Sequence, residues 1–293
     1  MAPELRTVTA NGTRLSYVEA GSGSPTVVFV HGSLDDFRSW RYQVEPFASH
    51  YRVIAYSRRY HYPNPWDAAG SEYTAEVHAA DLAAFIEALL HPPVHLVTSS
   101  YGGNVGLYLT SQRPGLVSSL VLGEPPLMPW LVHLPGGKAY WQRFLDEIWY
   151  PAREAFTEDR LEDGARLFLD GVMGRPTMQQ LGARGYQMIM DNAPEMRAES
   201  FASEAYFPAF TCADAQSLTQ PVLLCKGEHS PEIFHKISDD LAKCLSGAKP
   251  PVTIPGASHP MHIGNPKVYN KLVLDFLHQN DANHGLERQQ RID

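Results

Sequence analysis

Short apolar runs separated by helix-length segments are the feature that most constrains the fold of this chain. The runs are VVFV (27–30), VIAY (53–56), VHLV (94–97), SLVL (119–122), VLLC (222–225) and VTIP (252–255). Because polar residues do not alternate within them, these runs predict strands covered on both faces, as in a parallel sheet. Between two of them, residues 75–90 carry apolar side chains at helical spacing. The pattern predicts an α/β fold with a mostly parallel, doubly wound sheet.

Two segments depart from the alternation. Asn11-Gly12 lies between two strand-like pieces and suits a tight turn, so the chain should begin with a β-hairpin. From Pro125 to about Gln220 there is no strand-like run, but amphipathic pieces are present. We therefore expect a helical cap at 126–215 inserted into a core formed by 1–125 and 216–280. Residues 281–293 are polar and lack periodicity, which predicts a disordered tail.

The charge and the apolar runs exclude several classes of partner. The formal net charge is −8, so no basic surface is indicated for nucleic acid or anionic lipid. No apolar run approaches the roughly 20 residues of a membrane span, and the N-terminus does not resemble a signal peptide. Cys212, Cys225 and Cys244 are odd in number and lack metal-ligand spacing, which predicts reduced thiols. We expect a soluble cytoplasmic protein that acts on a small molecule and uses no metal or other cofactor.

The stretch HLVTSSYGG (95–103) offers a nucleophile at the end of a predicted strand. A sharp turn from strand into helix can expose a serine oxygen when the residues two before and two after it are small. Ser100 has Thr98 and Gly102 at these positions, whereas Ser99 has the bulky Tyr101. We predict Ser100 as the nucleophile. The alternative is that both serines only cap the following helix.

Three separated motifs together resemble the α/β-hydrolase superfamily over about residues 5–280. His31-Gly32-Ser33 resembles the oxyanion loop, 98–102 the nucleophile turn with its first glycine replaced, and IPGASHPMHIGNP (254–266) the segment that bears the catalytic histidine. The resemblance implies that His259 takes the proton of Ser100, with His262 as a competing neighbour. It also implies that the oxyanion is held by the backbone N–H of Tyr101 and that of Ser33 or Leu34.

The third catalytic residue departs from the common pattern. The position where the family usually has an aspartate reads Gly227-Glu228-His229-Ser230, with Ser230 in place of the acid. Glu124 directly follows the SLVL strand, a position from which some members of the superfamily take their acid. We predict Glu124 as the partner of His259, with Glu228 as the main rival. The alternative for Glu124 is a carboxylate that faces water at the start of the cap.

The loop SRRYHYPNP (57–65) also departs from the family, and its role is open. Arg58 and Arg59 are either structural ion-pair partners or contacts for a polar or anionic substrate group, and His61 has no assigned role. We expect His31 to shape its loop by hydrogen bonding. Residues expected to contact substrate are His31, Arg58, Tyr60, Leu127, Met128 and Trp130.

The sequence thus predicts a serine hydrolase that cleaves a carboxylic ester or lactone of a mostly apolar molecule through an acyl-enzyme. The alternatives are a ligand receptor that retains the hydrolase pocket, a Ser/His lyase without a cofactor, a thioesterase and a carbon–carbon hydrolase.

Overall fold

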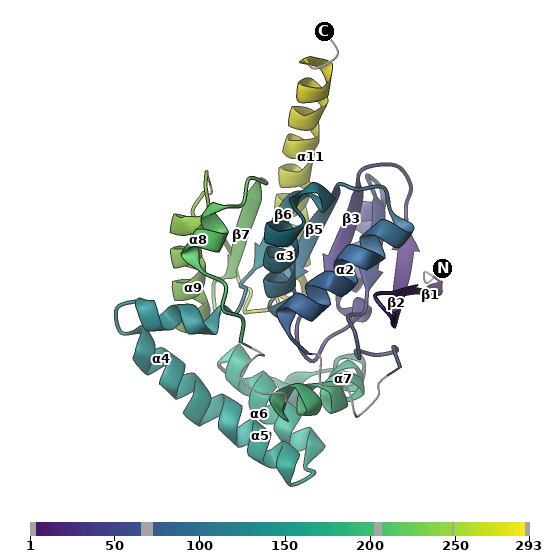
Figure 1. Cartoon of the computed structure of the whole chain (residues 1–293). Helices are drawn as coiled ribbons and strands as arrows, with labels where there is room; N and C mark the ends of the chain where they lie inside the picture. The colour runs from purple at the N-terminus through teal and green to yellow at the C-terminus, as the bar shows by residue number, and fades with distance from the viewer. Residues whose placement is uncertain (1–3, 66–72, 202–206, 248, 291–293) are drawn as a thin grey trace.

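The computed structural model describes residues 4–65, 73–201, 207–247 and 249–290, and for 282–290 only the backbone (Figure 1). Within these residues an eight-stranded sheet has the order β1-β2-β4-β3-β5-β6-β7-β8. The strands are β1 (Leu5–Ala10), β2 (Thr13–Ala20), β3 (Thr26–Val30), β4 (Arg52–Tyr56), β5 (Val94–Ser99), β6 (Val117–Gly123), β7 (Val222–Gly227) and β8 (Val252–Ile254). β2 pairs antiparallel with β1 and β4, and every other pairing is parallel. The predicted α/β fold with a mostly parallel sheet is confirmed.

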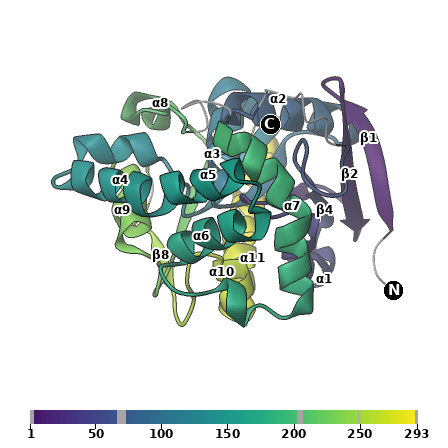
Figure 2. The same cartoon turned by 90° about the horizontal axis from the view of Figure 1, so that it is seen from below.

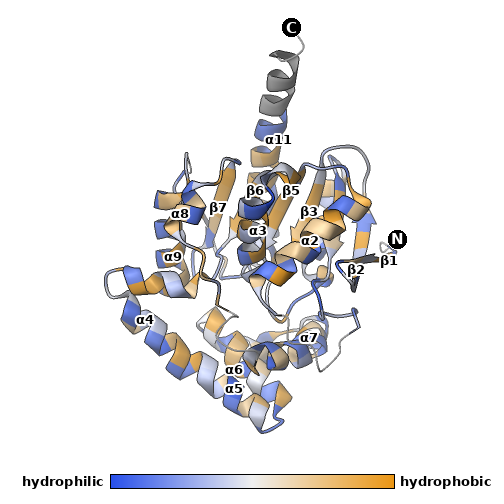
Figure 3. Ribbon diagram, viewed as in Figure 1, coloured by the Kyte–Doolittle hydropathy of each residue, from blue (hydrophilic) through white to orange (hydrophobic). Residues whose placement is uncertain are grey.

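Successive residues of the central strands pack into two different cores, which explains their continuous apolar sequence. Val28 and Val30 belong to a core shared with α2 (Ala75–Leu89), α3 (Tyr101–Gln112) and α9 (Glu232–Cys244). Val27 and Phe29 belong to a core on the other face, shared with α1 (Val44–Ala48) and α11 (Pro266–Gln290). Figure 3 shows the strands between these layers as the most apolar part of the molecule.

A helical insertion separates β6 from β7. It contains η3 (Met128–His133), α4 (Gly137–Phe144), η4 (Leu145–Trp149), α5 (Tyr150–Thr157), α6 (Leu161–Met173), η5 (Met178–Gln180), α7 (Ala183–Phe201) and α8 (Cys212–Gln216). Helices α4 to α7 lie together beyond one end of the strands, and the view from below shows them in front of the sheet (Figures 1 and 2). We propose 126–215 as the cap. The remaining short helices are η1 (Phe37–Tyr42), η2 (Pro114–Leu116) and α10 (Met261–Gly264).

The prediction of three reduced thiols is wrong for two of them. Cys212 and Cys244 form a disulfide, with their Cα atoms 5.3 Å apart. Cys212 begins α8 and Cys244 ends α9, two helices that pack together although the cysteines lie 32 positions apart in the sequence. Cys225 is free and buried in β7. Burial raises the pKa of its thiol to about 12.

The C-terminal segment also differs from its prediction. Helix α11 continues past Asp281, where the sequence predicts that a disordered tail begins, as far as Gln290. The segment LERQQ (286–290) consists of residues that favour helix, which gives a physical reason for the continuation. Residues 291–293 lie outside the described part. None of the helices in the described part is long and apolar enough to cross a membrane.

Candidate active site

Ser100 occupies a strained turn between β5 and α3. Its φ is 51° and its ψ −126°, a conformation that side-chain-bearing residues rarely adopt. The Ser100 N–H donates to the carbonyl oxygen of Gly123 at 2.7 Å, which ties the turn to β6. The Ser100 hydroxyl makes no capping hydrogen bond to α3. The structure therefore places Ser100 in the strained turn that the sequence predicts, and its hydroxyl does not cap the following helix.

Glycines around Ser100 allow the backbones to approach closely. A Cβ at Gly102 would lie 2.3 Å from the Val30 carbonyl oxygen, and one at Gly32 would lie 2.9 Å from the Cβ of Ser100. Thr98, which replaces the usual first glycine, faces Gly106, where an added Cβ would lie 3.0 Å from the Thr98 methyl group. The Thr98 hydroxyl donates to the carbonyl oxygen of Val121. Because Gly106 on α3 has no side chain, there is room for Thr98 at this position.

A buried carboxylate orients His259. Nδ1 of His259 lies 2.7 Å from Oε2 of Glu124, which is fully buried at the end of β6. The other Glu124 oxygen, Oε1, accepts a hydrogen bond from the Gly227 N–H at 2.9 Å. The His259 ring also stacks on Phe234 at 4.1 Å. Since Glu124 accepts the Nδ1 proton, Nε2 carries the lone pair, and among the described residues it has no hydrogen-bond partner.

Glu228 and His262, the alternative candidates for the acid and the base, lie in other surroundings. The Glu228 side chain is 51% exposed, and its Oε2 accepts a hydrogen bond from the Gly256 N–H at 2.7 Å. His262 is buried against the ring of Trp40, and burial lowers its pKa to about 3. The structure therefore brings Glu124, and not Glu228, to His259, while His262 is held in the core as a neutral side chain.

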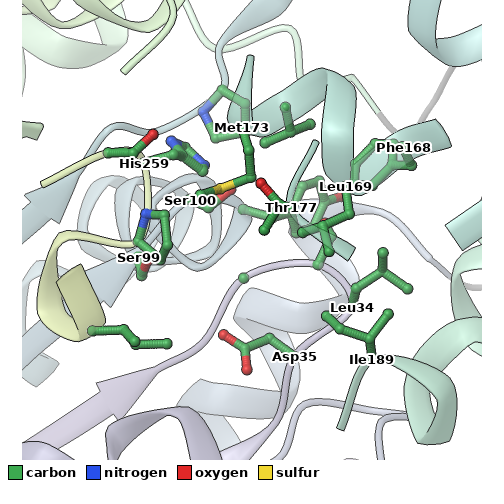
Figure 4. A pocket seen from close by; sticks show the side chains of 18 of the residues that line it. Leu34, Asp35, Ser99, Ser100, Phe168, Leu169, Met173, Thr177, Ile189 and His259 are labelled. Carbon is green, nitrogen blue, oxygen red and sulfur yellow. The ribbon is translucent and has the colours of Figure 1, made fainter. Parts of the chain in front are cut away.

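A cavity of about 370 Å³ connects these residues with the insertion. Ser100 and His259 lie beside each other in its wall, as Figure 4 shows, and Ser33, Leu34 and Tyr101 also line it. Tyr101 is the first residue of α3, so its N–H points out of the helix start. Much of the remaining wall is apolar and comes from the insertion, including Phe144, Phe168, Leu169, Val172, Met173 and Ile189. The cavity can receive an apolar group next to the serine.

Most of the residues predicted to contact substrate do not line this cavity. Of the six, only Met128 lines it. The Trp130 indole N–H turns away to a carboxylate oxygen of Asp240 on α9, and Leu127 is fully buried in the core. Both residues follow Glu124 closely along the chain, but closeness in sequence does not determine the direction of a side chain.

The other three, His31, Arg58 and Tyr60, hold loops. Nε2 of His31 accepts from the Arg58 N–H at 2.9 Å, as expected for a loop-shaping histidine, and Arg58 Nη2 donates to the Gly32 carbonyl oxygen at 3.1 Å. Tyr60 packs against the ring of Tyr73. Arg59 pairs with Asp81 through contacts of 2.7 and 2.6 Å. The loop 57–65 is therefore structural at these positions.

Asp35 is a pocket residue that the sequence analysis missed. It follows Leu34 directly and lines the cavity, as Figure 4 shows. Burial, together with the adjacent Asp36, raises the pKa of Asp35 to about 8. Its Oδ1 accepts a hydrogen bond from the Asp36 N–H at 3.0 Å, and the carboxyl group offers a polar contact to a ligand in the cavity. Its place directly after His31-Gly32-Ser33-Leu34 was the available signal.

Comparisons with known proteins identify the fold family of the chain. A family model described as alpha/beta hydrolase fold matches residues 25–266. Epoxide hydrolase 3 of Mus musculus is 32% identical over 122 residues, covering 41% of this chain and 33% of that protein. The non-heme chloroperoxidase of Streptomyces lividans is 41% identical over 129 residues, covering 41% and 45%. The chain thus matches less than half the length of either relative.

Among solved structures, one described as "Est816 as an N-Acyl homoserine lactone degrading enzyme" superimposes with a TM-score of 0.73. The two chains are 22% identical, and the match covers 92% of this chain and 100% of the other. At this identity the likeness concerns the fold.

Proposed function

Because this chain belongs to the α/β-hydrolase fold family, we propose that it is a serine hydrolase that cleaves a carboxylic ester or lactone of a mostly apolar small molecule. The observation that carries the proposal is the 2.7 Å contact between Glu124 and His259 beside Ser100 in one cavity wall. Ser100 is the proposed nucleophile, His259 the general base and Glu124 the acid that orients it.

The proposed reaction has two steps. As the Ser100 oxygen attacks the substrate carbonyl, Nε2 of His259 takes the hydroxyl proton, and Glu124 stabilises the imidazolium that forms. The imidazolium then gives this proton to the leaving alcohol, and an acyl-enzyme remains. In the second step His259 deprotonates a water that attacks the acyl carbonyl, and the acid product leaves as the Ser100 proton is restored. Negative charge on the carbonyl oxygen is stabilised by the N–H of Tyr101 and that of Ser33 or Leu34.

The cavity supports an apolar acyl or alcohol group. Its volume of about 370 Å³ lies within the range of small-molecule pockets, roughly 300–1,000 Å³. Asp35 adds a polar group to this wall, which suits a substrate that carries one polar group apart from the ester.

The nucleophile separates this proposal from the epoxide hydrolase relatives. Epoxide hydrolases of this fold carry aspartate at the nucleophile turn, and this chain has Ser100 there. A serine attacks an acyl carbonyl and leaves an ester intermediate that water can hydrolyse. Ester or lactone cleavage therefore fits the residues better than epoxide opening.

The first test is intact-protein mass spectrometry after exposure to a fluorophosphonate. We expect one adduct on the natural chain, its loss in Ser100→Ala and slow formation in His259→Ala. Ser99→Ala is the matched control and should still be labelled, because only its neighbour occupies the strained turn. If a folded natural chain forms no adduct, Ser100 is not activated and a ligand receptor becomes the better function.

The second test separates hydrolysis from the other chemistries of a serine nucleophile. A panel of esters, lactones and thioesters should show turnover of esters or lactones, with a trapped acyl-enzyme on Ser100. Turnover without a covalent intermediate would favour a Ser/His lyase.

A further inference from the structure

A buried cluster of acceptor groups joins α7 to the loop that follows β4. His61 belongs to that loop, and Glu195 and Glu199 lie one turn apart on α7. The side chains of His61 and Glu195 are 0% and 2% exposed, and Glu199 is fully buried. Each of the three offers a ligand atom, and these atoms all lie within 4.8 Å of one another.

The neighbouring backbone fixes the tautomer of His61. Nδ1 lies 2.8 Å from the carbonyl oxygen of Asp35, which can only accept, so Nδ1 carries the hydrogen. Nε2 therefore presents a lone pair, and it lies 3.1 Å from Oε1 of Glu195. Two acceptors this close need a proton or a cation between them. A histidine that donates one ring N–H to a carbonyl is also the usual arrangement of a metal ligand.

The acceptors of the cluster lack donors. By distance and angle, Nε2 of His61 and the carboxylate oxygens of Glu195 and Glu199 find no N–H or O–H donor among the described residues, although Asn192 lies beside His61 and the two carboxyl groups lie within hydrogen-bonding reach of each other. Buried polar atoms are rarely left unpaired, because each costs free energy. Arg58 is the nearby cation, but its Nη2 donates to Gly32, and Nε and Nη1 make no hydrogen bond to the carboxylates. The Arg58 guanidinium can balance the charge of only one ionised carboxylate, so the pair can take up either a cation or a proton.

We propose that His61, Glu195 and Glu199 form a buried site for a divalent transition-metal ion, best suited to Zn²⁺. Zinc takes imidazole nitrogen and carboxylate oxygen ligands at about 2.0–2.2 Å, so three ligand atoms grouped this closely can share one ion. One imidazole and two carboxylates favour zinc over magnesium or calcium, which prefer oxygen ligands alone. A water completes the fourth position of the site.

The bound ion would link helix α7 of the cap to the loop that follows β4 in the core. Helix α7 contributes Met188 and Ile189 to the wall of the active-site cavity. The same helix is held to the loops of the core by Asn192. Its side chain accepts a hydrogen bond from the Tyr62 N–H at 2.9 Å and donates one to Asp36 at 2.7 Å. A metal bound one turn further along α7 fixes the same wall more firmly. The site lies in the core and takes no part in the proposed chemistry at Ser100.

A shared proton is the competing occupant. Burial raises the pKa of both carboxyl groups, so in the absence of a cation a proton can lie between them. The two occupants predict different measurements, because a proton needs no metal and is not removed by a chelator.

The test uses the whole chain, prepared without a histidine tag, stripped with dipicolinate and dialysed. Zn²⁺ is then titrated against a fluorescent chelator, and zinc content is measured by mass spectrometry. We expect one zinc per chain, a thermal midpoint that rises when Zn²⁺ is added, and Co²⁺ absorption bands in the visible when cobalt replaces zinc. Absence of zinc binding, with no shift of the midpoint, would overturn the proposal in favour of the proton.

Isosteric variants assign the ligands. Glu199→Gln and Glu195→Gln keep the shape of the side chain and should each weaken zinc binding by at least about 100-fold, since even an outer-shell change costs 10–100-fold. Glu228→Gln is the matched control, because Glu228 sits near His229 at 3.8 Å on the surface and should leave binding unchanged. Circular dichroism of the metal-free variants checks the fold. Equal zinc binding by the natural chain and Glu199→Gln would place the ion elsewhere and overturn the assignment.

Discussion

At the residue scale, the orientation of one imidazole depends on one buried carboxylate. Glu124 has a φ of 48°, and its two oxygens bind His259 and the Gly227 N–H. Changing Glu124 to Gln keeps the shape but replaces an acceptor with an amide that can stabilise the wrong tautomer of His259. We expect kcat to fall by about 10²–10⁴-fold. Steady-state kinetics on an ester substrate measures this.

Glu228→Gln serves as the control for that prediction. Its side chain is half exposed and binds the backbone of Gly256, so kcat should change little. A large loss in Glu228→Gln together with normal turnover in Glu124→Gln would reverse the assignment of the acid.

A second residue-scale prediction concerns the packing under the nucleophile turn. In Gly102→Ala the new methyl group would meet the carbonyl oxygens of Val30 and His31 at 2.3 and 2.6 Å. We expect the free energy of unfolding in urea to fall by at least about 2 kcal/mol, because both neighbours are backbone atoms that cannot move aside. Gly115→Ala is the control, since an added Cβ there meets nothing within 4 Å. Equal stability of the two variants would contradict the close approach.

At the element scale, α6 and α7 of the insertion determine what fits beside Ser100. Phe168, Leu169, Val172 and Met173 all come from α6 and line the cavity. We expect kcat/KM to rise with acyl length over acetate, butyrate and hexanoate esters, because binding of the longer chain is realised in the transition state. Equal kcat/KM across the series would show that this wall does not contact the acyl group.

The disulfide gives the second prediction at this scale. Cys212–Cys244 joins α8, at the end of the insertion, to α9 of the core. Replacing both cysteines with serine should lower the free energy of unfolding by about 2–4 kcal/mol. In the absence of a reductant, we expect a thiol reagent to label no cysteine in the folded chain. After denaturation it should label one cysteine, Cys225. Three thiols after denaturation would mean that the bond is absent.

That thiol count also bears on the compartment. Disulfides persist in oxidising environments and are rare in the cytosol. The expected cytoplasmic location and the Cys212–Cys244 bond therefore favour different compartments, and the thiol count of protein taken from its own source decides between them.

At the scale of the whole molecule, the sequence predicted the elements well and the contacts between distant side chains poorly. Runs such as VVFV indicate strands because burial on both faces leaves no polar position, and each predicted run is a strand in the structure. Ser100 could be chosen over Ser99 because the size of neighbouring residues is a local property. Glu124 against Glu228 could only be ranked, because the direction of a side chain depends on packing.

The remaining features arise from packing between segments that are far apart in sequence. His61 meets Glu195 across 134 positions, and Cys212 meets Cys244 only because α8 packs on α9. Nothing in the local pattern around these residues indicates their partners. The role of Arg58 is open in the sequence for the same reason, since its burial against the loop that contains Gly32 is a property of the assembled fold.

The insertion leaves the sheet after β6 and returns to β7, and these two strands are neighbours with Leu120 opposite Val222. Ser100, Glu124 and His259 all follow strands of the sheet, so none of them is carried by the inserted helices. In evolutionary terms the insertion is a separable segment, because it leaves and re-enters the sheet at two neighbouring strands. Exchange of the inserted helices by recombination would therefore change the apolar wall of the cavity and leave Ser100, Glu124 and His259 in place.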